Sequence, residues 1–129
     1  MTNVAHKDLT DPNLHEPKGA GAAAANSIYV ANGGGSGSWK LPIIRATATL
    51  SPASVAANTT AEQLFTISGV ALATDVVVSV SKPTAQAGLG IVGWRVSADN
   101  QVGITFSNNT GSPIVPTASQ VYTIILNRN

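Results

Sequence analysis

The chain contains no cysteine, and charged and aromatic residues are scarce. Of its 129 residues, seven are lysine or arginine and six are aspartate or glutamate, and aromatic residues make up 5%. The absence of cysteine excludes disulfide bonds, thiolate metal ligands and a cysteine nucleophile. Seven scattered cations cannot neutralise many phosphate groups, which disfavours a nucleic-acid partner bound through a basic patch. The composition therefore argues against thiol-based and nucleic-acid functions.

Long apolar runs are also missing. No apolar run exceeds five residues, whereas a transmembrane helix needs about 20. The first 14 residues show no apolar run after their charges, so they do not have the pattern of a signal peptide. We therefore expect neither a membrane partner nor a targeting segment.

The character of the sequence changes near residue 45. Residues 1–45 hold both histidines and a glycine-rich stretch at 32–38, and no strand or helix periodicity persists there beyond Ser27–Ala31. The glycine-rich stretch is expected to be a flexible loop. Because residues 1–45 cannot build a core of their own, we expect an extended, largely irregular N-terminal arm at 1–45 and a folded domain at 46–129.

The second region, the β-domain, is built from short segments in which apolar and polar residues alternate. Period-two alternation is typical of half-buried strands, and the intervening clusters of Gly, Asn and Pro are typical of turns. The predicted strands are Ala46–Leu50, Glu62–Ser68, Asp75–Ser81, Ile91–Ala98, Val102–Ser107 and Gln120–Asn127. Six strands with one apolar face each predict the all-β class, as a small antiparallel β-sandwich.

The same alternation predicts which side chains face the core. The expected core-facing sets are Val76, Val78 and Val80 on one strand, Val92, Trp94 and Val96 on another, and the further aromatic residues Phe65, Phe106 and Tyr122. Packing, rather than sugar binding by exposed rings, is the expected role of these aromatic residues.

Catalytic constellations are scarce. The two histidines, His6 and His15, lie in the arm, whereas a metal site normally needs three or four ligands on fixed elements and a Ser-His-Asp triad needs a firmly held histidine. The carboxylates of the β-domain are Glu62, Asp75 and Asp99. The two aspartates stand at turn or strand-start positions, where Asp commonly accepts hydrogen bonds from nearby backbone. We therefore expect no enzyme, no catalytic residue, no metal and no cofactor.

Gly88–Gly93 matches the G-x-G-x-x-G pattern of dinucleotide-binding loops. That site requires a strand before the glycines and a helix after them, because the pyrophosphate sits on the helix N-terminus. Here a loop precedes the motif and a predicted strand around Trp94 follows it. The glycines are expected instead to allow a bulge or a close approach of two backbones.

Two parts of the chain resemble virion proteins of tailed bacteriophages. Asp8–Ala20, with an HEPKG core at His15–Gly19, leads to Ser27–Trp39, and this resembles an N-terminal motif in which HEPKG precedes a VYVA-(D/N)-G-x-G-S-G-x-W stretch. The second part resembles a β-domain of phage structural proteins. Its matching segments are Ala61–Gly69, Val76–Pro83, Ala87–Gly93, Arg95–Ser97 and Ile104–Thr110. Together the two parts cover most of the chain.

The resemblance implies a non-enzymatic capsid decoration, or cement, protein. It would bind the outer surface of the assembled head and stabilise it by bridging subunits of the major capsid protein, its expected partner. We expect a homotrimer located on the outer surface of the virion capsid and assembled in the bacterial cytoplasm. The alternative is a head-fibre or tail-fibre attachment protein that binds a host receptor or glycan. Because no coiled-coil or receptor-binding extension follows the β-domain, a compact capsid protein is the expectation.

The residues expected to contact the capsid or neighbouring subunits lie in the arm. They are His15, Glu16, Pro17, Lys18 and Gly19 of the HEPKG motif, together with Tyr29 and Trp39. The two aromatic residues flank the glycine-rich stretch, and two apolar anchors around a flexible segment suit docking on a protein partner. The arm is expected to order on binding, which requires a large contact area to offset the lost conformational entropy.

Overall fold

The computed structural model describes residues 20–34 and 37–128. The chain divides into two compact units between Pro42 and Ile43, slightly before the boundary expected at residue 45. No helix in the described part of the chain is long and apolar enough to span a membrane.

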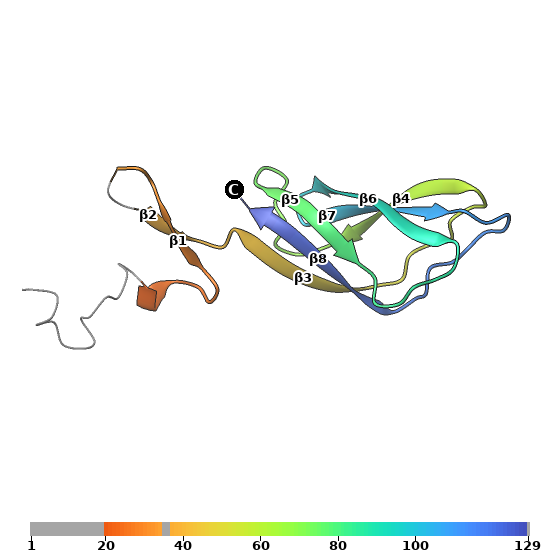
Figure 1. Ribbon diagram of the computed structural model, residues 1–129, viewed down its shortest axis with the longest axis horizontal. Helices are drawn as coiled ribbons and strands as arrows, with labels where there is room; N and C mark the ends of the chain where they lie inside the picture. Colours follow the sequence, from red (N-terminus) through yellow and green to blue (C-terminus); the bar gives the residue numbers. More distant parts are fainter. Residues whose placement is uncertain (1–19, 35–36, 129) are drawn as a thin grey trace, which may run out of the picture. The chain divides into compact units, whose positions relative to one another are not determined.

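The first unit contains a short 3-10 helix, η2 (Ala20–Ala22), and two strands, β1 (Ile28–Ala31) and β2 (Gly37–Lys40), which pair as an antiparallel hairpin (Figure 1). The strand expected near Ser27–Ala31 is thus confirmed. The prediction of a loop over the whole of 32–38 is wrong for its last two residues, because Gly37 and Ser38 pair with β1 as part of β2. Glycine and serine have low strand propensity, so their composition concealed β2.

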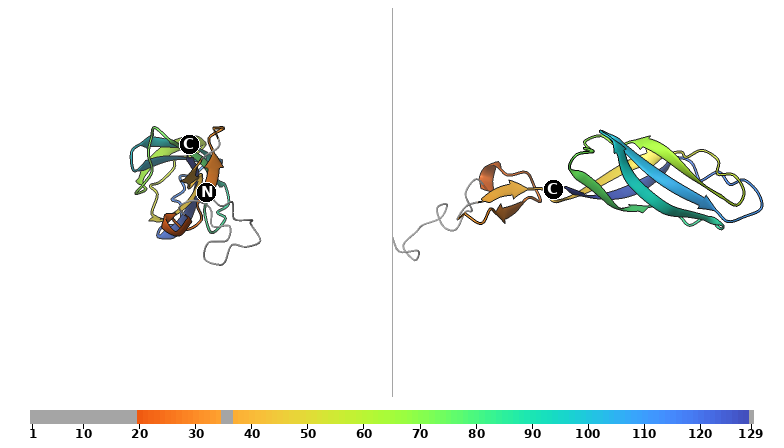
Figure 2. Two further views of the ribbon diagram at one scale, coloured as in Figure 1. Left: turned by 90° about the vertical axis from the view of Figure 1, so that its left-hand side faces the viewer. Right: turned by 90° about the horizontal axis from the view of Figure 1, so that it is seen from above.

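The second unit is a β-sandwich of six strands. They are β3 (Ile43–Leu50), β4 (Thr59–Thr66), β5 (Asp75–Ser81), β6 (Leu89–Ala98), β7 (Gln101–Asn108) and β8 (Gln120–Arg128). The strands pair antiparallel in two sheets, with the orders β3-β8-β5 and β4-β7-β6 (Figure 1). They run along the length of this unit, so its loops gather at the two ends (Figure 2). The predicted all-β sandwich and its six strands are confirmed.

The core lies between the two central strands. Its fully buried apolar side chains are Val102, Ile104 and Phe106 of β7, Tyr122, Ile124 and Leu126 of β8, and Val55 in the segment before β4. The rings of Phe106 and Tyr122 meet edge to face, with centroids 6.5 Å apart, which joins the two sheets. Each fully buried apolar side chain contributes about 1.5–3 kcal/mol relative to an exposed one. The core positions predicted for Phe106 and Tyr122 are confirmed.

A β-bulge in β5 overturns the predicted face of that strand. The pairing of β5 with β8 shifts register between Val77 and Ser79. Val77 and Val80 are therefore buried, whereas Val76 is 58% and Val78 54% exposed. The prediction that Val76, Val78 and Val80 share a face is wrong, because one extra residue in a strand reverses the alternation beyond it.

Two further register shifts interrupt β6, between Ile91 and Gly93 and between Val96 and Ala98. Ile91 and Val96 pack against the core, whereas Val92 is 59% and Trp94 38% exposed. The predicted core position of Val92 is therefore wrong, and that of Trp94 holds only in part. Trp94 pairs with the buried Ile104, but β6 is an edge strand and leaves one side of the indole uncovered. Phe65, expected in the core, is half-buried against it.

Candidate functional site

The hairpin of β1 and β2 presents apolar side chains on both of its faces. Its register pairs Tyr29 with Trp39 and Ile28 with Lys40, and directly paired residues lie on the same face. The rings of Tyr29 and Trp39 contact each other edge to face, with centroids 5.4 Å apart. The other face carries Ile28 and Val30, which are 51% and 40% exposed. The structure thus brings together the two aromatic residues that the sequence analysis had singled out.

Gly37 allows the tyrosine ring to lie against β2. A methyl group at this position would collide with the carbonyl oxygen of Val30 and lie 2.8 Å from Cε1 of Tyr29. The ring therefore occupies the space that a side chain at Gly37 would need. The hairpin turn begins at Asn32, whose Oδ1 accepts a hydrogen bond from the backbone N–H of Gly34 at 2.9 Å. Sequence reasoning missed Gly37, because one glycine among several carries no distinguishing signal.

Among residues 20–34 and 37–42, no core covers the hairpin. A two-stranded hairpin alone is at best marginally stable in water. Ile28, Tyr29 and Val30 are each at least 39% exposed, and Lys40 is the one charged residue in the stretches 20–34 and 37–42. Covering these side chains with another protein surface would stabilise the hairpin and the contact together, mainly through apolar burial.

The remaining residues expected to contact the capsid belong to the HEPKG motif. His15–Gly19 and His6 lie outside the described residues. Within residues 20–34 and 37–128, no three side chains of His, Asp or Glu gather where they could hold a metal ion. The geometry of the candidate site therefore rests on Tyr29, Gly37 and Trp39.

The carboxylates of the β-sandwich are engaged in structural contacts. Asp75 accepts hydrogen bonds from Arg128, at 2.6 and 2.7 Å, and from the backbone N–H of Ala71 at 2.9 Å. Arg128 lowers the pKa of Asp75 from its ordinary 3.8 to about 2, so this buried group stays ionised. Asp99 accepts a hydrogen bond from the backbone N–H of Leu72 at 2.8 Å. The predicted backbone contacts of both aspartates are confirmed.

The third carboxylate, Glu62, forms a bidentate ion pair with Arg95 on the outward side of the β4-β7-β6 sheet. The two distances are 2.6 Å to Nε and 2.9 Å to Nη2, and the pair lowers the pKa of Glu62. The side chain of Glu62 lies over Gly103, where a methyl group would meet its carboxylate. Each of the three carboxylates therefore has a structural partner: Arg95 for Glu62, Arg128 for Asp75 and the backbone N–H of Leu72 for Asp99.

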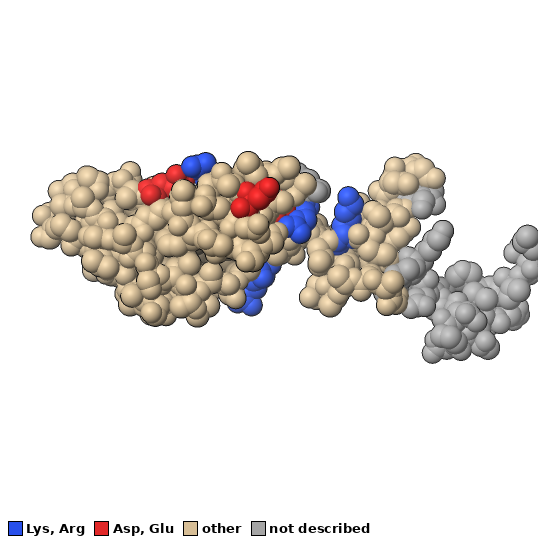
Figure 3. All heavy atoms as spheres, turned by 180° about the vertical axis from the view of Figure 1, so that it is seen from behind, with Lys and Arg blue, Asp and Glu red and all other residues tan. Residues whose placement is uncertain are grey.

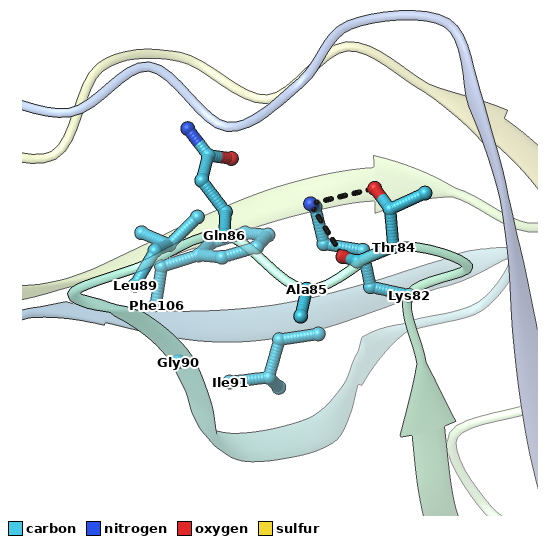
Figure 4. A pocket seen from close by; sticks show the side chains of 8 residues that line it. All are labelled: Lys82, Thr84, Ala85, Gln86, Leu89, Gly90, Ile91 and Phe106. Atoms are coloured by element: carbon cyan, nitrogen blue, oxygen red, sulfur yellow. Dashed lines mark hydrogen bonds between the residues drawn. The ribbon is translucent and has the colours of Figure 1, made fainter.

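A pocket of about 290 Å³ lies along the connection between β5 and β6. Its lining residues are Lys82, Thr84, Ala85, Gln86, Leu89, Gly90, Ile91 and Phe106 (Figure 4). Nζ of Lys82 donates to the carbonyl oxygen of Thr84 at 2.8 Å, and Nε2 of Gln86 donates to that of Val115 at 2.9 Å. These polar groups are already paired, so the pocket offers a mainly apolar wall.

The glycines of the Gly88–Gly93 motif have structural roles. Gly88 adopts a φ of +75°, which non-glycine residues rarely adopt, and strand β6 begins at the next residue. Gly93 follows the first register shift of β6. The expected bulge is confirmed at Ile91–Gly93, and the strand expected around Trp94 begins earlier, at Leu89 within the motif.

The most distinctive surface of the described part of the first unit is thus a hairpin with the Tyr29–Trp39 pair on one side, Ile28 and Val30 on the other, and Lys40 as its single charge. Charged side chains are also sparse on the β-sandwich, where the face in Figure 3 shows a few acidic and basic groups near one another and a broad uncharged area beside them. Comparisons of this chain with protein-family models, with curated proteins and with solved structures found no match.

Proposed function

We propose that this chain is a bacteriophage capsid decoration protein that binds the outer surface of the assembled head. The hairpin docks on subunits of the major capsid protein, and the β-sandwich forms a compact body on the shell. The observation that carries the proposal is the hairpin itself, which holds the Tyr29–Trp39 pair on one face and exposes Ile28 and Val30 on the other. The resemblance of Asp8–Trp39 to arms of phage virion proteins supports the same conclusion.

The proposed mechanism is physical rather than chemical. A protein that binds the assembled shell but not its separated subunits stabilises the shell by mass action. A homotrimer would carry three hairpins, so each trimer could contact several capsid subunits and bridge them. Copy number separates this function from fibre attachment, because decoration requires many copies per virion and a fibre attachment protein only a few.

Replacing both Tyr29 and Trp39 with alanine should weaken binding to heads at least tenfold. Buried aromatic anchors commonly dominate the energy of a protein interface, and alanine removes both rings. Co-sedimentation of the full-length variant with heads that lack the protein measures the effect. Leu72→Ala is the control, because Leu72 is 55% exposed in the loop between β4 and β5 and should be dispensable. Undiminished binding of the double variant, with the control also unchanged, would refute the role of the hairpin.

Binding to heads should also depend little on salt. The described hairpin carries Lys40 as its single charge, so the contact gains little from Coulomb attraction that salt could screen. We expect the affinity to change less than about threefold between roughly 0.05 and 0.5 M NaCl, where the Debye length falls severalfold. Release of the protein from heads at moderate salt would show that charges dominate the contact.

A further inference from the structure

The sequence contains a single Asn-Gly pair, Asn32–Gly33, and it follows β1 directly in the hairpin. Both residues are exposed. Asparagine is chemically labile in proteins, because the backbone nitrogen of the next residue can attack its side-chain amide. A side chain on that next residue shields the nitrogen, and glycine has none. Asn32 therefore has the least shielded neighbour of any asparagine in the chain.

The hydrogen bonds of the loop favour this attack. Among residues 20–34 and 37–128, the backbone N–H of Gly33 donates no hydrogen bond, and no other part of the structure lies within 4 Å of the position of a Cβ atom on Gly33. The N–H of Gly34 donates to Oδ1 of Asn32 at 2.9 Å. A hydrogen bond to this oxygen draws electrons away from Cγ, the atom that is attacked, and holds the side chain against the following backbone. The attacking nitrogen is thus accessible and the carbon is activated.

The nitrogen that follows other exposed asparagines is already engaged. After Asn26, the N–H of Ser27 donates to the carbonyl oxygen of Ala24 at 3.1 Å. After Asn109, the N–H of Thr110 donates to a side-chain oxygen at 2.9 Å. A hydrogen-bonded N–H gives up its proton less readily, because the bond must be broken first. Every other described asparagine is also followed by a residue with a side chain. Sequence and structure thus select the same site.

We propose that Asn32 deamidates spontaneously in the folded protein, with the backbone nitrogen of Gly33 as the nucleophile. This nitrogen loses its proton to hydroxide and bonds to Cγ, while the side-chain amide takes up a proton and leaves as ammonia. The product is a cyclic succinimide, which water opens. Cleavage of the new bond between nitrogen and Cγ gives aspartate, and cleavage of the original peptide bond gives β-linked isoaspartate. In total, one water is consumed and one ammonia is released.

Deamidation changes both the charge and the backbone of the hairpin. The described hairpin has Lys40 as its single charge, and the new carboxylate lowers the formal net charge of the chain from +1 to zero. Isoaspartate also adds one carbon atom to the main chain directly after Ala31, which pairs with Gly37. The reaction itself needs no capsid. Only its consequence rests on the proposed function: a modified hairpin should bind heads less tightly, because the contact would have to desolvate a carboxylate.

Peptide mapping of the full-length protein tests the proposal. Trypsin cuts after lysine and arginine, so Asn26 and Asn32 fall in one peptide, residues 19–40, and tandem mass spectrometry distinguishes them. After incubation of the folded protein at mildly alkaline pH, the mass gain from exchange of NH₂ for OH should appear at least tenfold faster at Asn32 than at Asn26. A sample digested without incubation gives the baseline. Both aspartate and isoaspartate should form at position 32, because the succinimide opens on either side.

Two glycine variants separate the nucleophile from its surroundings. Gly33→Ala shields the attacking nitrogen and should slow the reaction at Asn32 at least fivefold. Gly34→Ala is the matched control, because it makes the same change one residue later, keeps the N–H that donates to Oδ1, and should change the rate less than twofold. Equal rates at Asn32 and Asn26 in the unmodified protein, aspartate without isoaspartate, or an unchanged rate in Gly33→Ala would each overturn the proposal. These measurements involve no heads, so their outcome is independent of the test of the proposed function.

Discussion

Replacing Asn108 with aspartate is expected to lower the free energy of unfolding by about 3 kcal/mol or more. Asn108 is fully buried at the end of β7. Its Nδ2 donates to the carbonyl oxygens of Val55 at 3.0 Å and Ser112 at 2.8 Å, and its Oδ1 accepts from N–H and Oγ1 of Thr110 at 2.9 and 2.8 Å. One side chain thus joins the segment before β4 to the long connection between β7 and β8.

Aspartate has nearly the same shape, so the substitution leaves no cavity and isolates the hydrogen bonds. A carboxylate cannot donate to the two carbonyl oxygens, and it would bury a charge without a cation beside it. Urea denaturation measures the loss. Asn109→Asp makes the same change at the next, exposed residue and should cost little. If both variants lost equal stability, the burial of Asn108 would not be the cause. If the aspartate variant does not fold, Asn108→Ala provides a second measurement.

The second large effect is expected for Asp75→Asn, which should lower the free energy of unfolding by about 2 kcal/mol at pH 7. Asp75 is 5% exposed and forms a bidentate ion pair with Arg128. Its pKa falls from 3.8 to about 2 on folding, and each pKa unit corresponds to about 1.4 kcal/mol. Asparagine keeps the size and one acceptor oxygen but removes the charge that Arg128 stabilises.

The pH dependence of this effect follows from the direction of the pKa change. The folded chain binds the proton of Asp75 more weakly than the unfolded chain does, so the ion pair contributes fully above about pH 4. As the pH falls from about 4 towards 2, the carboxylate becomes protonated and the contribution is lost. Thermal unfolding across this range should show the unmodified protein and Asp75→Asn converging. Glu62→Gln, at the exposed ion pair, is the control and should change the stability little. A difference in stability between Asp75→Asn and the unmodified protein that stayed constant at every pH would contradict this explanation.

Alternation of apolar residues predicted the strands of the β-sandwich but not all of their faces. Asp75–Ser81 was predicted with both of its ends, and Val102–Ser107 lies within β7 (Gln101–Asn108). The sequence did not show the bulges in β5 and β6. A bulge depends on how a strand pairs with its neighbour, and the neighbour is distant in sequence. Val78 and Val92 were therefore expected inside and are exposed.

The candidate site was also predictable only in part, because it depends on how two strands pair. Tyr29 and Trp39 stand out because aromatic residues are rare in this chain, and the structure places their rings in contact. The sequence did not predict that they pair across a hairpin, because Gly37 lies in a glycine-rich stretch that is typical of a loop. In the structure Gly37 belongs to β2, and the tyrosine ring lies where a side chain at this position would be. Asn108 likewise belongs to a segment rich in turn residues, and its burial depends on Val55, far away in sequence.

The two tryptophans are divided between the two units, Trp39 in β2 of the hairpin and Trp94 in β6 of the sandwich. Each unit thus carries its own intrinsic fluorophore, and the sequence contains no third tryptophan to mix the signals. With Trp94→Phe the emission reports the hairpin alone, and with Trp39→Phe it reports the sandwich alone. Quenching and emission wavelength can then follow the docking of one unit and the unfolding of the other in the same unlabelled protein.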